Sequence, residues 1–175
     1  MNIFYLDHDP SLAAKYHCDK HCLKMIQETA LMLSTAHRIL DGNEYADNNK
    51  LYRKAYSNHP CTKWVRDADS HYYWAYALFD NLIDEYYSRY KKIHATSKLL
   101  HPLGSFPKNI NRDKEWSEPP QCMPKEYQRE STVDAYRLYY MKDKAKFAKW
   151  SFSKKPEWFN PTLESNELTD NETNI

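Results

Sequence analysis

Glycine is scarce in this chain, with two glycines in 175 residues, and this scarcity excludes several kinds of protein. Phosphate-binding loops of the G-x-G-x-x-G and Walker types need glycines close together, so a nucleotide cofactor held by such a loop is not expected. A sheet protein with many tight turns is disfavoured for the same reason. The scarcity therefore favours a mainly α fold that works without a cofactor.

The chain also lacks long apolar runs and closely paired cysteines. No segment has the length and hydropathy of a membrane span, and no apolar signal peptide precedes the body of the chain. The cysteines form no C-x-x-C pair and are too few for a small disulfide-rich domain. They are Cys18, Cys22, Cys61 and Cys122. These features predict a soluble protein with free thiols in a reducing cytoplasm, that of the host cell if the protein is viral.

Positive and negative charges nearly balance over the whole chain, which has a formal net charge of +1, but they are unevenly distributed along it. Residues 163–175 hold four acids and no lysine or arginine, which leaves 25 basic and 20 acidic groups in residues 1–162. A moderately basic body with an acidic end is compatible with binding a polyanion. We expect a single helical domain over residues 1–160 and a disordered acidic tail over residues 161–175.

Start and stop signals divide the chain into a few elements. Asp9 and Pro10 form a helix start, and Asp41 with Gly42 forms a helix end. The predicted helices span residues 10–40, 47–57, 62–95 and 131–150. Residues 2–6 form a strand or a buried extended arm, and the proline-rich residues 98–130 form a long loop. The predicted architecture is two long helices packed together, with shorter helices, a Pro-rich loop and a C-terminal arm.

The first long helix carries a narrow polar stripe on an otherwise apolar segment. At about 100° per residue, the stripe holds His17, Lys20, His21, Lys24, Gln27, Glu28 and Leu31. Ammonium, imidazole and carboxylate groups held together favour proton transfer or anion binding, because charge and burial shift their pKa values. The alternative interpretation is a solvated face with one Lys24–Glu28 pair at i,i+4 spacing.

Other patterns have structural explanations as well as functional ones. His17 with His21, and Cys18 with Cys22, are i,i+4 pairs that can share a metal, but cysteines on an apolar row are usually core and we expect no metal. His59 before Pro60 fits a capping residue. The fifteen tyrosines and five tryptophans fit core packing, although such rings also stack on bases.

Three motifs together resemble a known family. Asp19-Lys20-His21, followed by Lys24 and Glu28, is similar to the D-K-R-x-x-K-x-x-x-E helix of the pyrimidine dimer DNA glycosylase (T4 endonuclease V-like) superfamily. Asn58-His59-Pro60 with Trp64 resembles the N-H-P-x-x-x-x-W segment of that family, with three residues here between the proline and the tryptophan, and residues 155–159 resemble its terminal aromatic arm. The M-N-I-F start and the C-D-K-H motif also resemble proteins of tailed phages.

The resemblance implies a mechanism and roles for matching residues. In that family a primary amine attacks the deoxyribose C1′ at a damaged pyrimidine and forms an imine, and a glutamate stabilises the developing charge. Glu28 matches the glutamate. Asn2 is too bulky for efficient methionine removal, so the amine is that of Met1, with Lys20 or Lys24 as a substitute if it is buried.

We assign the remaining candidates by their place beside these motifs. His21 is placed with Glu28 and Met1 in catalysis. The candidate DNA contacts are Lys20, Lys24, His17, His59 and Trp158. The resulting prediction is a phage-type DNA-acting protein, a DNA glycosylase/AP lyase on damaged or modified pyrimidines.

Two alternatives remain at this point. One is a DNA base-modifying or nucleotide-processing enzyme that uses the same Lys/His/Glu face. The other is a non-enzymatic binder of nucleic acid or of a host protein. They differ in whether Lys20, Lys24 and Glu28 line a cleft or a flat exposed face.

Overall fold

The computed structural model describes residues 1–162, and within that range every regular element is helical. The α-helices are α1 Pro10–Tyr16, α2 Asp19–Leu40, α3 Glu44–Asn48, α4 Pro60–Asp67, α5 Asp69–Tyr90, α6 Leu100–Leu103 and α7 Thr132–Tyr139. The predicted mainly α, single-domain fold is confirmed. The predicted acidic tail lies outside the described residues from residue 163 onward. None of the described helices is long and apolar enough to cross a membrane.

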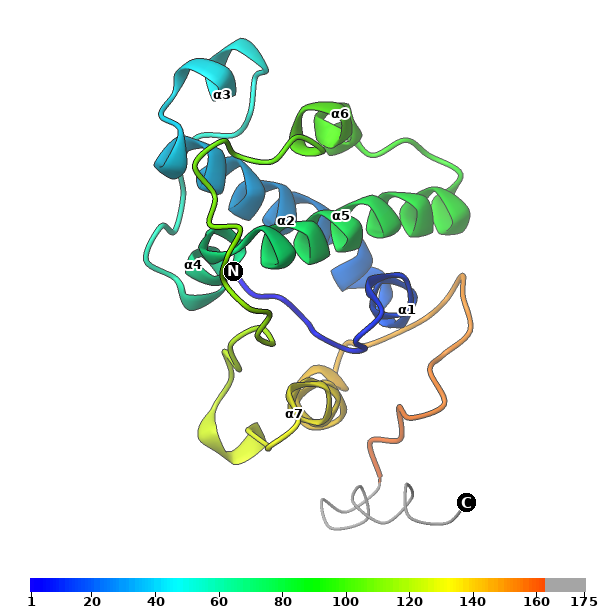
Figure 1. The fold of residues 1–175 in the computed structure, drawn as a ribbon. Helices are drawn as coiled ribbons and strands as arrows, with labels where there is room; N and C mark the ends of the chain where they lie inside the picture. Colours follow the sequence, from blue (N-terminus) through cyan, green and yellow to red (C-terminus); the bar gives the residue numbers. More distant parts are fainter. Residues whose placement is uncertain (163–175) are drawn as a thin grey trace.

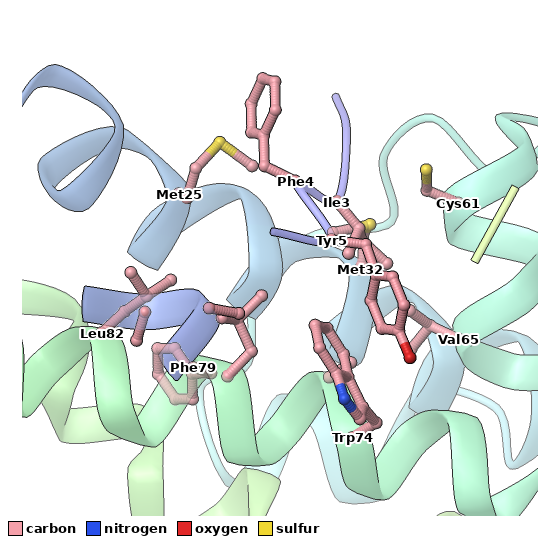
Figure 2. Close-up of a cluster of buried hydrophobic side chains, with 14 of the residues drawn as sticks. Ile3, Phe4, Tyr5, Met25, Met32, Cys61, Val65, Trp74, Phe79 and Leu82 are labelled. Carbon is pink, nitrogen blue, oxygen red and sulfur yellow. The ribbon is translucent and has the colours of Figure 1, made fainter. Parts of the chain in front are cut away.

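The core forms where α2 and α5 run alongside each other and an extended N-terminal arm crosses them (Figure 1). Residues 3–6 of this arm are buried and form no strand, which resolves the two possibilities left open for residues 2–6. Figure 2 shows Ile3, Phe4 and Tyr5 of the arm among side chains from the helices, such as Met25 and Trp74. Burial of each such large apolar side chain contributes roughly 1.5–3 kcal/mol to folding. The arm is therefore held by the core, and its position fixes the start of the chain.

Helix starts follow the local signals in the sequence. Oδ1 of Asp9 accepts a hydrogen bond from Ser11 N at 2.8 Å, with Pro10 in the first helical position. Oγ of Ser131 accepts from Asp134 N at 3.2 Å at the start of α7. Gly42, which follows α2 and its cap Asp41, has a φ of +81°, a conformation that glycine adopts without strain. These caps depend only on neighbouring residues.

The prediction of one continuous helix over residues 10–40 is wrong, because the helix is interrupted between α1 and α2. His17 and Cys18 are extended, with ψ values of 129° and 163°. The guanidinium of Arg89, on α5, donates to the carbonyl oxygens of Lys15 at 3.0 Å and His17 at 2.9 Å. These carbonyls therefore keep hydrogen-bond partners at the break, which makes the break tolerable inside the protein.

The helix predicted over residues 62–95 is likewise two helices. Ala68 is extended between α4 and α5, and the Asp69 N–H donates to the Asn111 carbonyl at 2.9 Å. A ring nitrogen of His71 lies 3.0 Å from the Trp64 carbonyl and satisfies the end of α4. In place of the helix predicted over residues 47–57, the structure has the shorter α3, which begins and ends earlier in the chain. The last helix ends at Tyr139 and continues as a π-turn over Tyr140–Lys144.

The segment predicted as a loop over residues 98–130 contains three short helical turns and otherwise no regular structure. They are η1 Ala95–Leu99, α6 and η2 Lys125–Tyr127. The segment passes beside the N-terminus in Figure 1. Cys122 is tied there, since its carbonyl accepts from Asn2 Nδ2 at 3.0 Å. The long loop thus passes next to the start of the chain before it reaches α7.

Candidate active site

The start of the chain lies against the middle of α2. The α-amino nitrogen of Met1 is 3.6 Å from Oε2 of Glu28, and Asn2 N donates to the same oxygen at 3.2 Å. The Glu28 side chain is 15% exposed, and that of Met1 only 1%. Met1 as a residue is half-buried, so the surface it does expose is mostly main chain. An amine and a carboxylate thus share a semi-enclosed position at the protein surface.

Asn2 anchors this arrangement through its side chain. Its Oδ1 accepts from Tyr136 Oη at 2.7 Å, and its Nδ2 donates to the Cys122 carbonyl. The same Oη lies 2.8 Å from the Pro120 carbonyl oxygen, and its one proton is available to either acceptor. Groups from α7, the loop and the arm therefore meet around the Asn2 amide. Sequence reasoning missed Asn2 and Tyr136 as positioning residues, because no local pattern links residues so distant in sequence.

The lysines of the polar stripe lie beside Glu28 on the outside of α2. Nζ of Lys24 is 3.1 Å from Oε1 of Glu28, and the Lys24 side chain is 62% exposed. Lys20, one turn earlier, is exposed, and its ammonium lies 4.6 Å from the centre of the Phe147 ring. Both cations can therefore reach a polyanion in solvent, and the Glu28 carboxylate bridges Lys24 to the α-amino group.

His59 lies at the N-terminus of α4, close to the same pair. Its Nδ1 accepts from Cys61 N at 3.2 Å, which makes it the N-cap of α4. Burial lowers the pKa of His59, and the charge of the Met1 amine lowers this pKa further, while Glu28 opposes the shift. The charges of both Met1 and Glu28 therefore act on the pKa of His59, so the structure places His59 close to the pair.

His21 and His17 lie in the core and the structure does not bring them to the Met1–Glu28 pair. Nδ1 of His21 is 2.5 Å from Tyr140 Oη, and its ring stacks on Phe4 with centroids 4.2 Å apart. His17 is fully buried, with Nδ1 2.6 Å from the Ala13 carbonyl. Burial lowers the pKa of His17 to about 4 and that of His21 to about 2. The predicted catalytic role of His21 and DNA contact of His17 find no supporting geometry, because segments packed over the start of α2 cover both rings.

Trp158 is docked on the helical body, half-buried. Its ring meets those of Tyr16 and Tyr140 edge-on, with centroids 5.8 and 6.2 Å apart, and the Arg137 guanidinium lies 5.4 Å from its centre. It lines an open pocket of about 660 Å³. The lining holds four basic side chains and two acidic ones, those of Lys15, Arg137, Lys154, Lys155, Glu85 and Glu157. The aromatic arm thus borders a depression in which basic groups outnumber acidic ones.

The thiols of Cys18 and Cys22 do not resemble activated nucleophiles. Burial raises the pKa of the Cys22 thiol to about 12, and burial likewise raises that of Cys18. The hydrogen bond with Cys122 raises the pKa of Cys61, while the same contact lowers that of Cys122. Burial thus makes Cys18 and Cys22 poor nucleophiles. Within residues 1–162, the group of side chains close enough to share a metal is His59, Cys61 and Cys122 beside the arm, rather than the His17–His21 and Cys18–Cys22 pairs.

Comparison with known proteins gives one clear relationship. No curated protein and no solved structure matches the chain. A sequence model of the pyrimidine dimer DNA glycosylase family matches residues 1–98, more than half of the chain. This span contains the arm, α2 with Lys20, Lys24 and Glu28, and His59. The chain belongs to the pyrimidine dimer DNA glycosylase family, a family of DNA repair glycosylases.

Proposed function

We propose that this protein is a DNA glycosylase/AP lyase that acts on damaged or modified pyrimidines through the α-amino group of Met1. The observation that supports this most directly is the amine–carboxylate pair of Met1 and Glu28, at 3.6 Å. An α-amino group suits this task because its ordinary pKa is about 8, against about 10.4 for a lysine amine. At neutral pH, α-amino groups of this ordinary kind are unprotonated in a larger fraction than lysine amines are, and only the unprotonated form has a free lone pair.

The proposed reaction proceeds in two steps. The amine lone pair forms a bond to C1′ as the glycosidic C1′–N bond breaks, and the base leaves with that electron pair and is protonated. Loss of the amine proton and opening of the sugar give an imine between Met1 and C1′. Removal of a C2′ proton then expels the 3′ phosphate by β-elimination, which cleaves the strand. No cofactor is needed to balance either step.

Glu28 is the electrostatic partner in this scheme. Positive charge develops at C1′ as the base departs, and a nearby carboxylate stabilises it more strongly where solvent is limited. The 15% exposure of Glu28 meets this condition. Its hydrogen bond from Asn2 N fixes the carboxylate before DNA arrives.

Exposed cations around the pair supply a path for the DNA backbone. Lys20 and Lys24 lie one turn apart on α2 and point to solvent, a spacing suited to phosphates. We assign His59, beside the amine, and Trp158, beside the predominantly basic pocket, to further DNA contacts. Access to C1′ requires the damaged nucleotide to leave the stack, which costs least where pairing is already disturbed.

Borohydride trapping tests the proposal. The protein is incubated with three matched duplexes, containing a pyrimidine dimer, an abasic site or no lesion, and then reduced. We expect a covalent protein–DNA adduct with the first two duplexes and none with the third. Binding without an adduct on either lesion would assign the protein to non-enzymatic DNA binding, and an altered base without an adduct would assign it to base modification. Intact mass of the purified protein checks that its N-terminus is Met1.

A further inference from the structure

Three side chains of metal-ligand type meet beside the N-terminal arm. They are His59 and Cys61, at the start of α4, and Cys122, from the segment between α6 and η2. Their ligand atoms all lie within 4.8 Å of one another, and the two sulfur atoms are 3.5 Å apart. Neither cysteine has a part in the proposed DNA chemistry. Cys61 appears beside the arm residues in Figure 2.

The spacing is close to that of a tetrahedral metal site. Zinc–sulfur bonds of about 2.3 Å and zinc–nitrogen bonds of about 2.0 Å place two sulfurs about 3.8 Å apart and sulfur and nitrogen about 3.6 Å apart. The sulfur–sulfur distance of 3.5 Å is within a few tenths of an ångström of this value. The largest separation, 4.8 Å, needs a shift of about 1 Å, which a side-chain rotation supplies.

The backbone around the three residues is already held in place. Cys122 N is 3.3 Å from Tyr136 Oη, and the Cys122 carbonyl accepts from Asn2. Cys61 follows Pro60 in the first turn of α4, where Sγ also lies 3.6 Å from Asn2 Oδ1. Such fixed positions lower the entropy lost when ligands are ordered around an ion.

His59 changes its hydrogen bonding when it becomes a ligand. Its Nδ1 now accepts from Cys61 N at 3.2 Å. Coordination through Nδ1 uses that lone pair, and coordination through Nε2 places the ring proton on Nδ1, so either mode gives up the cap. Loss of one N-cap hydrogen bond costs little beside the free energy that a metal–imidazole bond supplies.

The donor set defines the class of ion. Two thiolates and an imidazole suit Zn²⁺, whereas Mg²⁺ and Ca²⁺ prefer oxygen ligands. Cysteines in this position have a second interpretation, that of small core residues, since Cys61 is fully buried. That interpretation does not account for the meeting of two sulfurs from distant segments, and the N-cap role of His59 does not require cysteines beside it.

We propose that His59, Cys61 and Cys122 bind one Zn²⁺ ion, with an exchangeable ligand such as water in the fourth position. The ion links two segments next to the Met1–Glu28 pair. One is the largely irregular segment that contains Cys122, and the other is the start of α4. Metal binding requires neither DNA nor an active amine. Its failure would therefore leave the proposed glycosylase function intact, and the converse also holds.

Cobalt serves as the spectroscopic probe of this site. The full chain is reduced with a non-thiol reductant, stripped with a chelator, shown to have four free thiols, and titrated with Co²⁺. We expect one equivalent to bind, with a thiolate-to-cobalt charge-transfer band and the intense visible bands of tetrahedral Co²⁺, and Zn²⁺ to displace it. Zn²⁺ should also raise the melting temperature, because it binds only the folded chain.

Variants assign the ion to these residues. Cys122→Ser should abolish the charge-transfer band or weaken affinity by at least about tenfold, and His59→Ala should weaken it comparably. His94→Ala is the matched control, because His94 Nδ1 caps η1 by the same bond, from Thr96 N at 3.2 Å, with no cysteine beside it. Unchanged binding in His94→Ala supports the site. Absence of stoichiometric uptake by the wild type, or full uptake by Cys122→Ser, would overturn it.

Discussion

The α-amino nitrogen of Met1 lies 3.6 Å from Oε2 of Glu28, although 27 positions separate the two residues in the chain. Their meeting depends on the buried residues 3–6, which lead the arm across the core, and on Asn2, which is tied to α7 and to the loop. Met1 thereby has a defined position, which its proposed role as nucleophile requires. The predictions below follow from this relationship and from its surroundings.

Glu28→Gln should abolish base release and strand cleavage while leaving DNA affinity nearly unchanged. The amide keeps an acceptor for Asn2 N but loses the negative charge that stabilises the transition state, an effect often of about 10²-fold or more. Single-turnover cleavage of lesion-containing duplex, beside a binding titration, measures both quantities. Asp47→Asn is the control, because it removes a carboxylate of α3 that is ion-paired with Arg38 near the C-terminal end of α2. Full activity in the Gln variant would remove Glu28 from the mechanism.

Lys20→Ala and Lys24→Ala should each weaken DNA binding and lower the salt dependence. If each ammonium contacts one phosphate, the slope of log K against log salt concentration falls by about one unit per variant. Binding titrations at several salt concentrations give this slope. Lys98→Ala, at an exposed lysine in η1, should leave it unchanged. An unaltered slope in both α2 variants would make that stripe a solvated face.

Acid should destabilise the protein through His17 and His21. Burial holds the folded pKa of these histidines at about 4 and about 2, below the ordinary value of 6.5. Their stabilising effect is therefore complete above pH 6.5 and is lost as pH falls toward the folded values. Between pH 6.5 and pH 5 the free energy of unfolding should drop by about 2 kcal/mol for each histidine.

Urea unfolding of His21→Gln tests this pH dependence. The variant should lose about 2 kcal/mol less than the wild type over the same interval. His101→Gln, at an exposed histidine, should follow the wild type. A wild-type stability that stays constant from pH 7 to pH 5 would contradict the burial of these rings.

Two truncations of the C-terminal end distinguish a role in folding from a role in DNA binding. Removal of residues 163–175 deletes four acidic groups and should leave the melting temperature unchanged and DNA binding equal or slightly tighter. Truncation before Trp158 removes its ring contacts with Tyr16 and Tyr140, and also the buried Phe159. It should lower the melting temperature, the DNA affinity, or both. If neither changes, the arm has no role in this protein.

Local patterns predicted the helical fold and the helix starts, but they could not predict where the helices break. The Asp9 and Ser131 caps depend on residues two or three positions away. The break before α2 depends instead on Arg89, and the break at Ala68 on Asn111, each more than 40 residues distant. Periodicity continues through both breaks, so the sequence indicated two unbroken helices.

The polar stripe lies on α2 from Lys20 to Leu31, but His17 precedes the break before α2, and the two halves of the stripe have different surroundings. Tyr140 and Phe147 cover His21, whereas Lys24 remains exposed and Glu28 partly so. Helical spacing shows which residues share a face, and only the tertiary structure shows how much of that face is covered. The role of Asn2 could not be predicted for the same reason, because its partners come from the loop and from α7.

The most direct test of the account is identification of the residue joined to DNA. After borohydride trapping on an abasic duplex, the adduct is digested and its peptides are sequenced by mass spectrometry. The account predicts that the reduced sugar is attached to the α-nitrogen of Met1, and that prior acetylation of that nitrogen prevents trapping. Attachment to Lys20 or Lys24, or undiminished trapping by the acetylated protein, would contradict it.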